Sequence, residues 1–274
     1  MIRELQSRVI REAWKDEPAS WGRVEEAAAG LLETVDITAI PVWDSGRRRR
    51  EVLDLVEQLR ATAGQDHSKT LFSRPRTADA LTHALRYAAE LGRPQAALSL
   101  SDAVDLLDET LGSDHPDALA ARGGLAAAYQ AADRLEQAIF LFERTLTDSE
   151  HILGPNHPHT LTSRGNLANT YWSAGRRDEA IDLYEQNLAD RERFLGPDHS
   201  CTLTSRDDLA YAYQSAGRLD KAVSLFEQIL ADRERRLGSD HTSTRLFRKK
   251  LADAYRTVGR DEDAEALLDP PPAS

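Results

Sequence analysis

The chain has 274 residues, and its 46 acidic and 35 basic residues give a formal net charge of −11. This acidic balance argues against a nucleic acid as the main ligand, while a hydrophobic content of 41% is enough for a packed core. The single cysteine, Cys201, excludes an intramolecular disulfide and a cysteine-based metal cluster, and it is compatible with a reducing cytoplasm.

Residues 1–68 show no internal repeat and are predicted to form an N-terminal helical cap region, with helices at about 2–15, 20–35 and 47–62. The first of these segments is amphipathic and lacks the apolar stretch of a signal peptide, and no apolar run approaches the length of about 18 residues that would span a membrane. We therefore expect a cytoplasmic protein without a membrane partner.

Two features of this cap region leave a choice open. Trp14, Trp21 and Trp43 are predicted to pack the cap onto the first repeat, and the alternative is a binding surface. The basic run 47–50 opens the third helix and is predicted to be a solvated face, with an acidic or phosphate partner as the alternative.

A marker of the form Leu-Gly-x-(Asp/Asn)-His recurs at residues 111–115, 153–157, 195–199 and 237–241, each time 42 residues further on. Segments 153–194 and 195–236 share 27 identities in 42 positions. A fixed period of this size predicts a stack of similar supersecondary units, each packed on its neighbours. We predict a repeat array at 69–269 followed by a disordered tail at 270–274. The array comprises a degenerate repeat at about 76–111, full repeats at about 112–153, 154–195 and 196–237, and a C-terminal capping repeat at 238–269.

Each repeat is predicted to be a helical hairpin. In the repeat at 154–195, Asn156 can cap a first helix, and Pro158 is tolerated in its first turn. Gly175 suits the left-handed conformation that ends a helix, and a second apolar stripe follows it. Residues of one type that recur every 42 positions are predicted to pack the hairpins together: Leu125, Leu167, Leu209 and Leu251; Ala126, Ala168, Ala210 and Ala252; Tyr129, Tyr171, Tyr213 and Tyr255; Ala138, Ala180, Ala222 and Ala264; and Phe142, Tyr184, Phe226 and Leu268.

The order Leu-Ala-x-x-Tyr, Ala-Gly-Arg, Glu-Ala-x-x-Leu-(Tyr/Phe)-Glu resembles the tetratricopeptide repeat. The 42-residue period and the phrases LGPNHPHTLTSRGNLANTYWSAGRRDEA and LADRERFLGPDH are similar to its kinesin-light-chain-like subclass, which is common in bacteria, particularly in actinobacterial proteins. The resemblance covers residues 76–268. It implies an all-α fold, a right-handed α-solenoid of helical hairpins with an N-terminal helical cap, and it implies a scaffold that binds other proteins.

In this family the first helix of each hairpin lines a concave groove, and the resemblance carries that role to matching positions here. The predicted groove residues bind a partner protein or peptide segment, and they vary between repeats while the packing positions do not. They are Thr162, Asn166, Asn169 and Trp172 in one repeat and Thr204, Asp207, Asp208, Tyr211 and Gln214 in the next.

The asparagine pairs and lysine clamp that family members use on a peptide are mostly missing. Of the asparagine pair only Asn166 is present, and Ala120, Thr162 and Thr204 stand where the lysine clamp would be. This departure argues against a C-terminal acidic tag and favours a partly apolar or basic segment near Trp172.

Arginine recurs in every full repeat, at Arg122, Arg164, Arg206 and Arg248. One interpretation is a set of structural bridges to the equally periodic Glu143, Glu185 and Glu227. The other is a row of guanidinium groups presented to carboxylates of a bound chain, which makes Arg164 and Arg206 candidate binding residues.

No catalytic signal is present: the phosphate-loop, nucleophile-elbow and zinc-protease motifs are all missing. The histidines at 115, 157, 199 and 241 are one repeat apart, too far to share a metal ion, and are predicted to cap turns. We expect a non-enzymatic scaffold that needs no cofactor and binds a protein or peptide; self-association is not indicated. The alternatives are a regulatory or sensor component whose ATPase or DNA-binding part lies on another chain, and a non-catalytic accessory to a biosynthetic enzyme.

Overall fold

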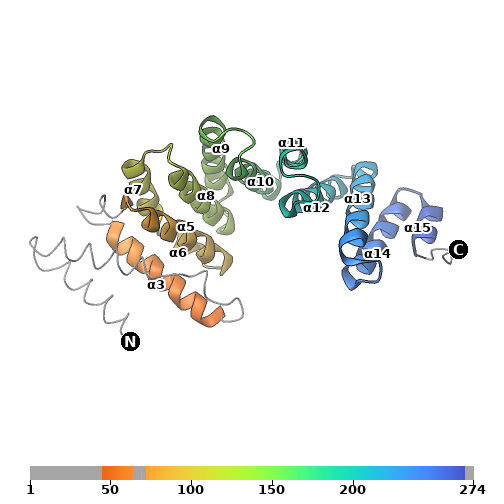
Figure 1. Cartoon of the computed structure of the whole chain (residues 1–274), viewed down its shortest axis with the longest axis horizontal. Coiled ribbons are helices and arrows are strands. Elements are labelled where there is room, and N and C mark those ends of the chain that lie inside the picture. Colours follow the sequence, from red (N-terminus) through yellow and green to blue (C-terminus); the bar gives the residue numbers. More distant parts are fainter. Residues whose placement is uncertain (1–44, 64–68, 70–71, 269–274) are drawn as a thin grey trace, which may run out of the picture. The chain divides into compact units, whose positions relative to one another are not determined.

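The computed structural model describes residues 45–63, 69 and 72–268, and within those ranges every regular element is a helix (Figure 1). The chain divides into two compact units, Met1–Pro155 and Asn156–Ser274. None of the helices in the described ranges is long and apolar enough to cross a membrane. The predicted helices at about 2–15 and 20–35, the three tryptophans of the cap region and the tail at 270–274 lie outside the described residues.

The first unit contains the one cap-region helix that the structure describes. The helix predicted at about 47–62 is found as α3, and its Leu55 and Leu59 are buried against the next hairpin. Helix α3 packs on α5, α6 and α7, α5 packs on α8, and α8 pairs with α9. The bounds are α3 (Ser45–Ala63), α5 (Pro75–Glu90), α6 (Pro94–Leu98), α7 (Ser101–Leu111), α8 (Pro116–Ala131) and α9 (Leu135–Ile152).

The second helix of the first hairpin is interrupted. Helix α6 ends at Leu98 and α7 begins at Ser101, where the other hairpins have one continuous helix. The Ser99 hydroxyl donates a hydrogen bond of 2.7 Å to the carbonyl oxygen of Ala96.

The second unit consists of three hairpins in sequence order. Within each hairpin the two helices pack on one another, and α11 also packs on α12 and α13 on α14. The bounds are α10 (Pro158–Ser173), α11 (Arg177–Phe194), α12 (Ser200–Ser215), α13 (Leu219–Leu237), α14 (Thr242–Thr257) and α15 (Asp261–Leu268). The second helix of the last hairpin, α15, has 8 residues and is shorter than α11 and α13.

Each of the periodic histidines caps a helix. The Nδ1 atoms of His115, His157, His199 and His241 accept a hydrogen bond of 3.2–3.3 Å from the backbone N–H two residues on. The prediction that these histidines cap turns is confirmed. The expectation that Asn156 caps α10 is wrong, because His157 takes the N-cap position one residue later.

The first helices end as the glycines predict. Gly175 has a φ of 77°, in the left-handed region, and the backbone N–H of Arg176 then reaches back to the carbonyl oxygen of Tyr171. In the preceding hairpin Asp133 takes the same place with a φ of 58°. Aspartate tolerates this conformation better than most residues with a side chain, so the turn is kept without glycine.

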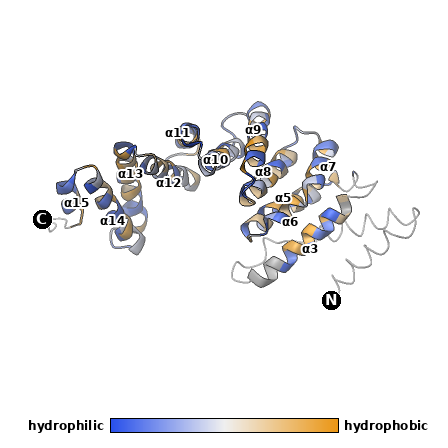
Figure 2. Ribbon diagram, turned by 180° about the vertical axis from the view of Figure 1, so that it is seen from behind, coloured by the Kyte–Doolittle hydropathy of each residue, from blue (hydrophilic) through white to orange (hydrophobic). Residues whose placement is uncertain are grey.

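The periodic apolar positions form the core of both units. Every periodic leucine of the Leu125 row and every alanine of both alanine rows is buried, as predicted. Two positions depart: Tyr129 is only partly buried, and Leu268 is 40% exposed. Leu268 is the last described residue of α15, and no described helix follows to cover it. Figure 2 shows that the helices carry both apolar and polar residues, as expected for hairpins packed in a stack.

Candidate binding surface on helices 10 and 12

The predicted binding residues lie on the first helices of two consecutive hairpins, α10 and α12. The side chains of Thr162, Asn169, Thr204 and Tyr211 are exposed. The remainder are half-buried, namely Asn166, Trp172, Asp207, Asp208 and Gln214. We call these nine residues the α10–α12 surface. Their use in binding stays a prediction.

The two predicted arginines lie elsewhere. Arg164 and Arg206 are buried, each about 5% exposed, and both donate to an aspartate on the second helix of their own hairpin. Arg164 Nη1 lies 2.5 Å from Asp190 Oδ2, and Arg206 Nη1 pairs with Asp232 Oδ2. These contacts support the structural interpretation of the arginine row.

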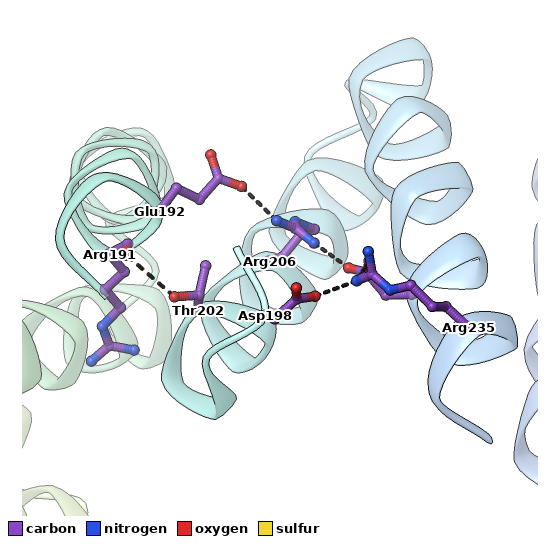
Figure 3. Close-up of polar contacts among 7 residues, drawn as sticks. Arg191, Glu192, Asp198, Thr202, Arg206 and Arg235 are labelled. Atoms are coloured by element: carbon purple, nitrogen blue, oxygen red, sulfur yellow. Dashed lines mark hydrogen bonds and ion pairs between the residues drawn. The ribbon is translucent and has the colours of Figure 1, made fainter. Parts of the chain in front are cut away.

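Arg206 also joins one hairpin to the next. Its Nη2 atom donates to Glu192 Oε1 at 2.6 Å, so one guanidinium lies between α11 and α13 (Figure 3). Arg248 repeats the backward contact by pairing with Glu234. In the first unit Arg122 likewise bonds to Asp148 at 2.7 Å and has Asp108 3.5 Å from its Nε.

The glutamates that were expected as partners of these arginines have other roles. Glu185 accepts hydrogen bonds from the Tyr213 hydroxyl and from Lys221, and the Tyr213 bond is the main cause that lowers its pKa. Glu227 accepts at 2.8 Å from the hydroxyl of Tyr255, whose pKa is raised to about 12 by burial and by this carboxylate. The expected pairing with the Glu143 row was therefore wrong for the bridges that the structure describes.

A hydrogen bond joins α11 to α10 at this surface. The Tyr184 hydroxyl on α11 donates to Asn169 Oδ1 on α10. Burial raises the pKa of Tyr184, and the nearby charge of Asp208 adds to this. Burial likewise raises the pKa values of Asp207 and Asp208 above the ordinary 3.8. The surface therefore presents amide, hydroxyl and carboxyl groups in a partly desolvated setting.

Helix α14 contributes a lysine that the sequence analysis did not single out for this surface. Lys250 Nζ lies 3.2 Å from the centre of the Tyr211 ring and 4.4 Å from that of Phe226. Burial raises the pKa of the Asp207 carboxyl, 43 residues earlier in the chain, and the positive charge of Lys250 partly offsets this rise. Lys250 stands one full period of 42 residues after Asp208. The repeat spacing is therefore a signal that would predict Lys250 on the same side of the array as Asp208. Its contact with aromatic rings is stabilising in a desolvated site.

Two residues of α11, Asn187 and Arg191, were also missed. Both are buried, and both approach α10 at Gly165. The predicted groove residues all lie on first helices, so the prediction does not include side chains that reach across from a second helix.

The described residues offer no group of three or more His, Cys, Asp and Glu side chains suited to a metal ion. The Nδ1 atoms of the marker histidines accept capping hydrogen bonds, and this shared role accounts for their periodic recurrence. Cys201 is half-buried in the first turn of α12.

Comparison with known families gives two matching models, both described as tetratricopeptide repeat. One matches residues 141–192, 166–235 and 209–269, and the other matches residues 118–159. Together they cover more than half of the chain. A search of curated proteins gave no significant match.

Several solved structures are similar. The repeats of a kinesin light chain-like protein from Podosopora anserina, described as nearly identical TPR-like repeats, are 33% identical, with a TM-score of 0.62 over 74% of this chain and 94% of that one. BtubC (BKLC) from P. vanneervenii is 22% identical, with a TM-score of 0.51 over 92% of this chain and 86% of that one. A Rap protein complexed with Competence and Sporulation Factor is 12% identical, with a TM-score of 0.52 over 95% and 77%. The last two show similarity of fold alone.

Proposed function

The chain belongs to the tetratricopeptide repeat proteins, which are protein-interaction scaffolds, and from this premise we propose that its α10–α12 surface binds an extended protein or peptide segment. One observation carries the proposal. The buried leucine and alanine rows keep the same residue from repeat to repeat. Most positions of the α10–α12 surface differ between the two helices, namely Asn166/Asp208, Asn169/Tyr211 and Trp172/Gln214, and Thr162/Thr204 is the identical pair. Selection for packing explains the first pattern, and a surface fitted to a partner explains the second.

The chemistry of the surface defines the segment that fits it. Asn166 carries both a donor and an acceptor, as the backbone of an extended chain requires. Trp172 and Tyr211 offer flat apolar faces, and Tyr211 is 47% exposed. The carboxyl groups of Asp207 and Asp208 favour basic groups nearby. A partly apolar segment with a basic residue opposite α12 meets all of these conditions.

The sensor and accessory alternatives use the same surface and differ only in the partner. A sensor component would bind a chain that carries the ATPase or DNA-binding part, and an accessory would bind a biosynthetic enzyme. Identification of the bound chain therefore separates these alternatives.

The test is crosslinked affinity capture from native lysate with the wild-type chain and with Thr162→Ala/Asn166→Ala/Trp172→Ala. Asn169 is left unchanged because it accepts the hydrogen bond of the Tyr184 hydroxyl, and its removal would leave a buried donor unpaired. We expect a protein that the wild type recovers and the variant does not.

The matched control carries three substitutions on the exposed side of α11, Asp182→Ala/Gln186→Ala/Arg193→Ala. It should recover the partner as well as the wild type does, and circular dichroism should show equal helix content in all three proteins. Equal recovery by the surface variant would place the interface elsewhere and would reject the proposal.

A further inference from the structure

Arg191 is a buried cation whose partners are all neutral. Its side chain is 8% exposed. Nη1 donates to the Cys201 carbonyl oxygen at 3.0 Å and to Ser205 Oγ at 2.7 Å, and Nη2 donates to the Leu161 carbonyl oxygen at 3.2 Å. Its Nε has no acceptor. In Figure 3 the Arg191 side chain extends away from the Glu192–Arg206 pair.

This arrangement differs from that of the other buried arginines. Arg122, Arg164 and Arg206 each contact an aspartate. No carboxylate in the described part of the chain lies within 4 Å of Arg191; Asp208 acts on it only from a greater distance. A buried charge without a contacting counter-charge costs free energy, and burial accordingly lowers the pKa of this guanidinium.

In the next repeat, the arginine that is equivalent to Arg191 has a carboxylate nearby. Arg233 stands 42 residues after Arg191, and its Nη2 lies 3.6 Å from Oδ2 of Asp207. Asp207 in turn stands 42 residues after Gly165. In the repeat that contains Arg191, the residue that would supply the carboxylate is therefore a glycine.

The space over Gly165 faces the nitrogen donors. A Cβ atom built on Gly165 would lie 3.0 Å from Asn187 Nδ2 and 3.7 Å from Arg191 Nη2. Asn187 is 1% exposed and its Oδ1 has no hydrogen-bond partner, while Gly165 itself is half-exposed on α10. Two buried donor groups thus approach the α10–α12 surface at the one position of α10 that has no side chain to cover them.

We propose that Gly165, Asn187 and Arg191 form a subsite that receives a carboxylate of the bound segment, either an acidic side chain or a chain terminus. The proposal rests on the proposed function, since it assumes a segment that lies along the α10–α12 surface. The incoming carboxylate takes the part that Asp207 plays toward Arg233. Charge-assisted hydrogen bonds of this kind are among the stronger polar contacts in proteins. The segment then carries an acidic group opposite α10 and a basic group opposite Asp207 and Asp208.

The first test supplies the carboxylate from the chain itself. Gly165→Asp is compared with Gly165→Asn, both combined with Asn187→Ile to reproduce the residue that the next repeat has at position 229. The two variants have the same shape and differ in charge. We expect the aspartate variant to melt higher by about 2–4 °C. An aspartate variant that melts no higher than the asparagine variant would overturn the subsite.

The second test uses three probe peptides on the full chain labelled with ¹⁵N-arginine and ¹⁵N-tryptophan. The probes are acetylated Ala-Ala-Glu-Ala-Ala amide, the same peptide with Gln in place of Glu, and acetylated penta-alanine with a free carboxyl terminus. The Glu and free-terminus probes separate the two sources of the carboxylate. We expect at least one of them to shift the Arg191 Nε–H resonance, the Gln probe to leave it unchanged, and Gly165→Asp to abolish the shift.

The outcomes separate this inference from the proposed function. If every probe moves the Trp172 indole resonance and none moves Arg191, segment binding stands and the carboxylate subsite falls. If a carboxylate probe moves Arg191 but the lysate capture is unaffected by the surface variant, the subsite stands and segment binding falls. An Arg191 response that is equal for the Glu and Gln probes, or that persists in Gly165→Asp, rejects the subsite.

Discussion

At the scale of single residues, the histidine of the recurring marker is a helix cap. His199 Nδ1 accepts from the backbone N–H of Cys201 and satisfies one of the donors left free at the start of α12. An imidazole nitrogen here does what asparagine or serine oxygens do at most caps. The capping role at the start of α8, α10, α12 and α14 accounts for the recurrence of this histidine.

Replacing this cap should cost measurable stability. We expect His199→Ala to lower the free energy of unfolding by about 0.5–2 kcal/mol, because a helix-start N–H loses its acceptor, and His199→Asn to keep most of it. Urea denaturation followed by circular dichroism measures both. His159→Ala is the control, since the His159 side chain is exposed and caps no helix. An asparagine variant as unstable as the alanine variant would contradict the capping role.

Two adjacent glycines of α8 should respond oppositely to alanine. A Cβ on Gly123 meets no atom within 4 Å, so Gly123→Ala should raise the free energy of unfolding by about 0.5–1 kcal/mol through helix propensity alone. A Cβ on Gly124 would lie 3.1 Å from Leu85 Cβ, which is fixed to the backbone of α5. Gly124→Ala should therefore destabilise the fold by about 1–3 kcal/mol. Chemical denaturation of the pair tests this, and equal effects would show that α5 and α8 can separate without cost.

At the scale of elements, α12 carries two adjacent carboxyl groups whose environment works against their charge. Burial raises the pKa of Asp208, and the charge of Asp207 adds to this. Because the folded chain then holds the proton more tightly than the unfolded chain, ionisation of Asp208 costs folding free energy. This cost is absent below the unfolded pKa and grows as the pH rises through the folded pKa.

Asp208→Asn should therefore be more stable than the wild type at neutral pH, and the advantage should disappear on acidification toward the unfolded pKa near 3.8. Guanidinium denaturation at several pH values between neutral pH and the unfolded pKa measures the difference in free energy of unfolding between the variant and the wild type. Asp182→Asn on the exposed side of α11 is the control for the removal of one carboxylate from the surface. If the stability advantage of Asp208→Asn grew on acidification, the pKa of Asp208 would be lowered in the folded chain and not raised.

The elements also show what the sequence could and could not predict. The period, together with the glycines and the marker histidines, was enough for the hairpins, their turns and the buried rows. The partners of the arginine row were not predictable, because three acidic rows, at Glu185, Asp190 and Glu192, recur with the same period. Spacing along the chain cannot choose among them; the choice depends on which side of the helix each faces.

The residues of the α10–α12 surface were likewise only partly predictable from the sequence. Positions on one helix follow from helical periodicity, so Thr162 and Tyr211 could be assigned from sequence as exposed. Arg191 and Lys250 reach the surface from α11 and α14, and this depends on how neighbouring helices pack. The break between α6 and α7 is a further local feature that the period did not predict.

At the scale of the whole molecule, contacts are made between neighbouring helices within each of two compact units. Stability in such an array is a sum of local terms, so damage should remain local. We expect Arg206→Met to cost about 1–3 kcal/mol, because Glu192 and Asp232 lose their buried partner while Asp232 keeps its contact with Arg235.

Hydrogen exchange should resolve where that loss falls. Amide protons of α11, α12 and α13 should exchange faster in Arg206→Met, and those of α3, α5 and α8 in the first unit should be unchanged. Arg193→Met on the exposed side of α11 is the control and should alter neither group. Faster exchange spread evenly over both units would show that the chain unfolds as one cooperative body.

The contacts of Arg206 bear on how such a chain changes length. One partner lies 14 residues before it and the other 26 residues after it. Both contacts recur with the 42-residue period, since Arg164 pairs with Asp190 and Arg248 pairs with Glu234. A duplication or deletion of one whole period therefore leaves each arginine on either side of the cut with both of its acidic partners, wherever in the repeat the cut falls. Any other length separates an arginine from one of its acids. Gain and loss of whole repeats is thus the tolerated kind of insertion and deletion, and a laboratory series of longer arrays can be built by copying residues 153–194 in tandem.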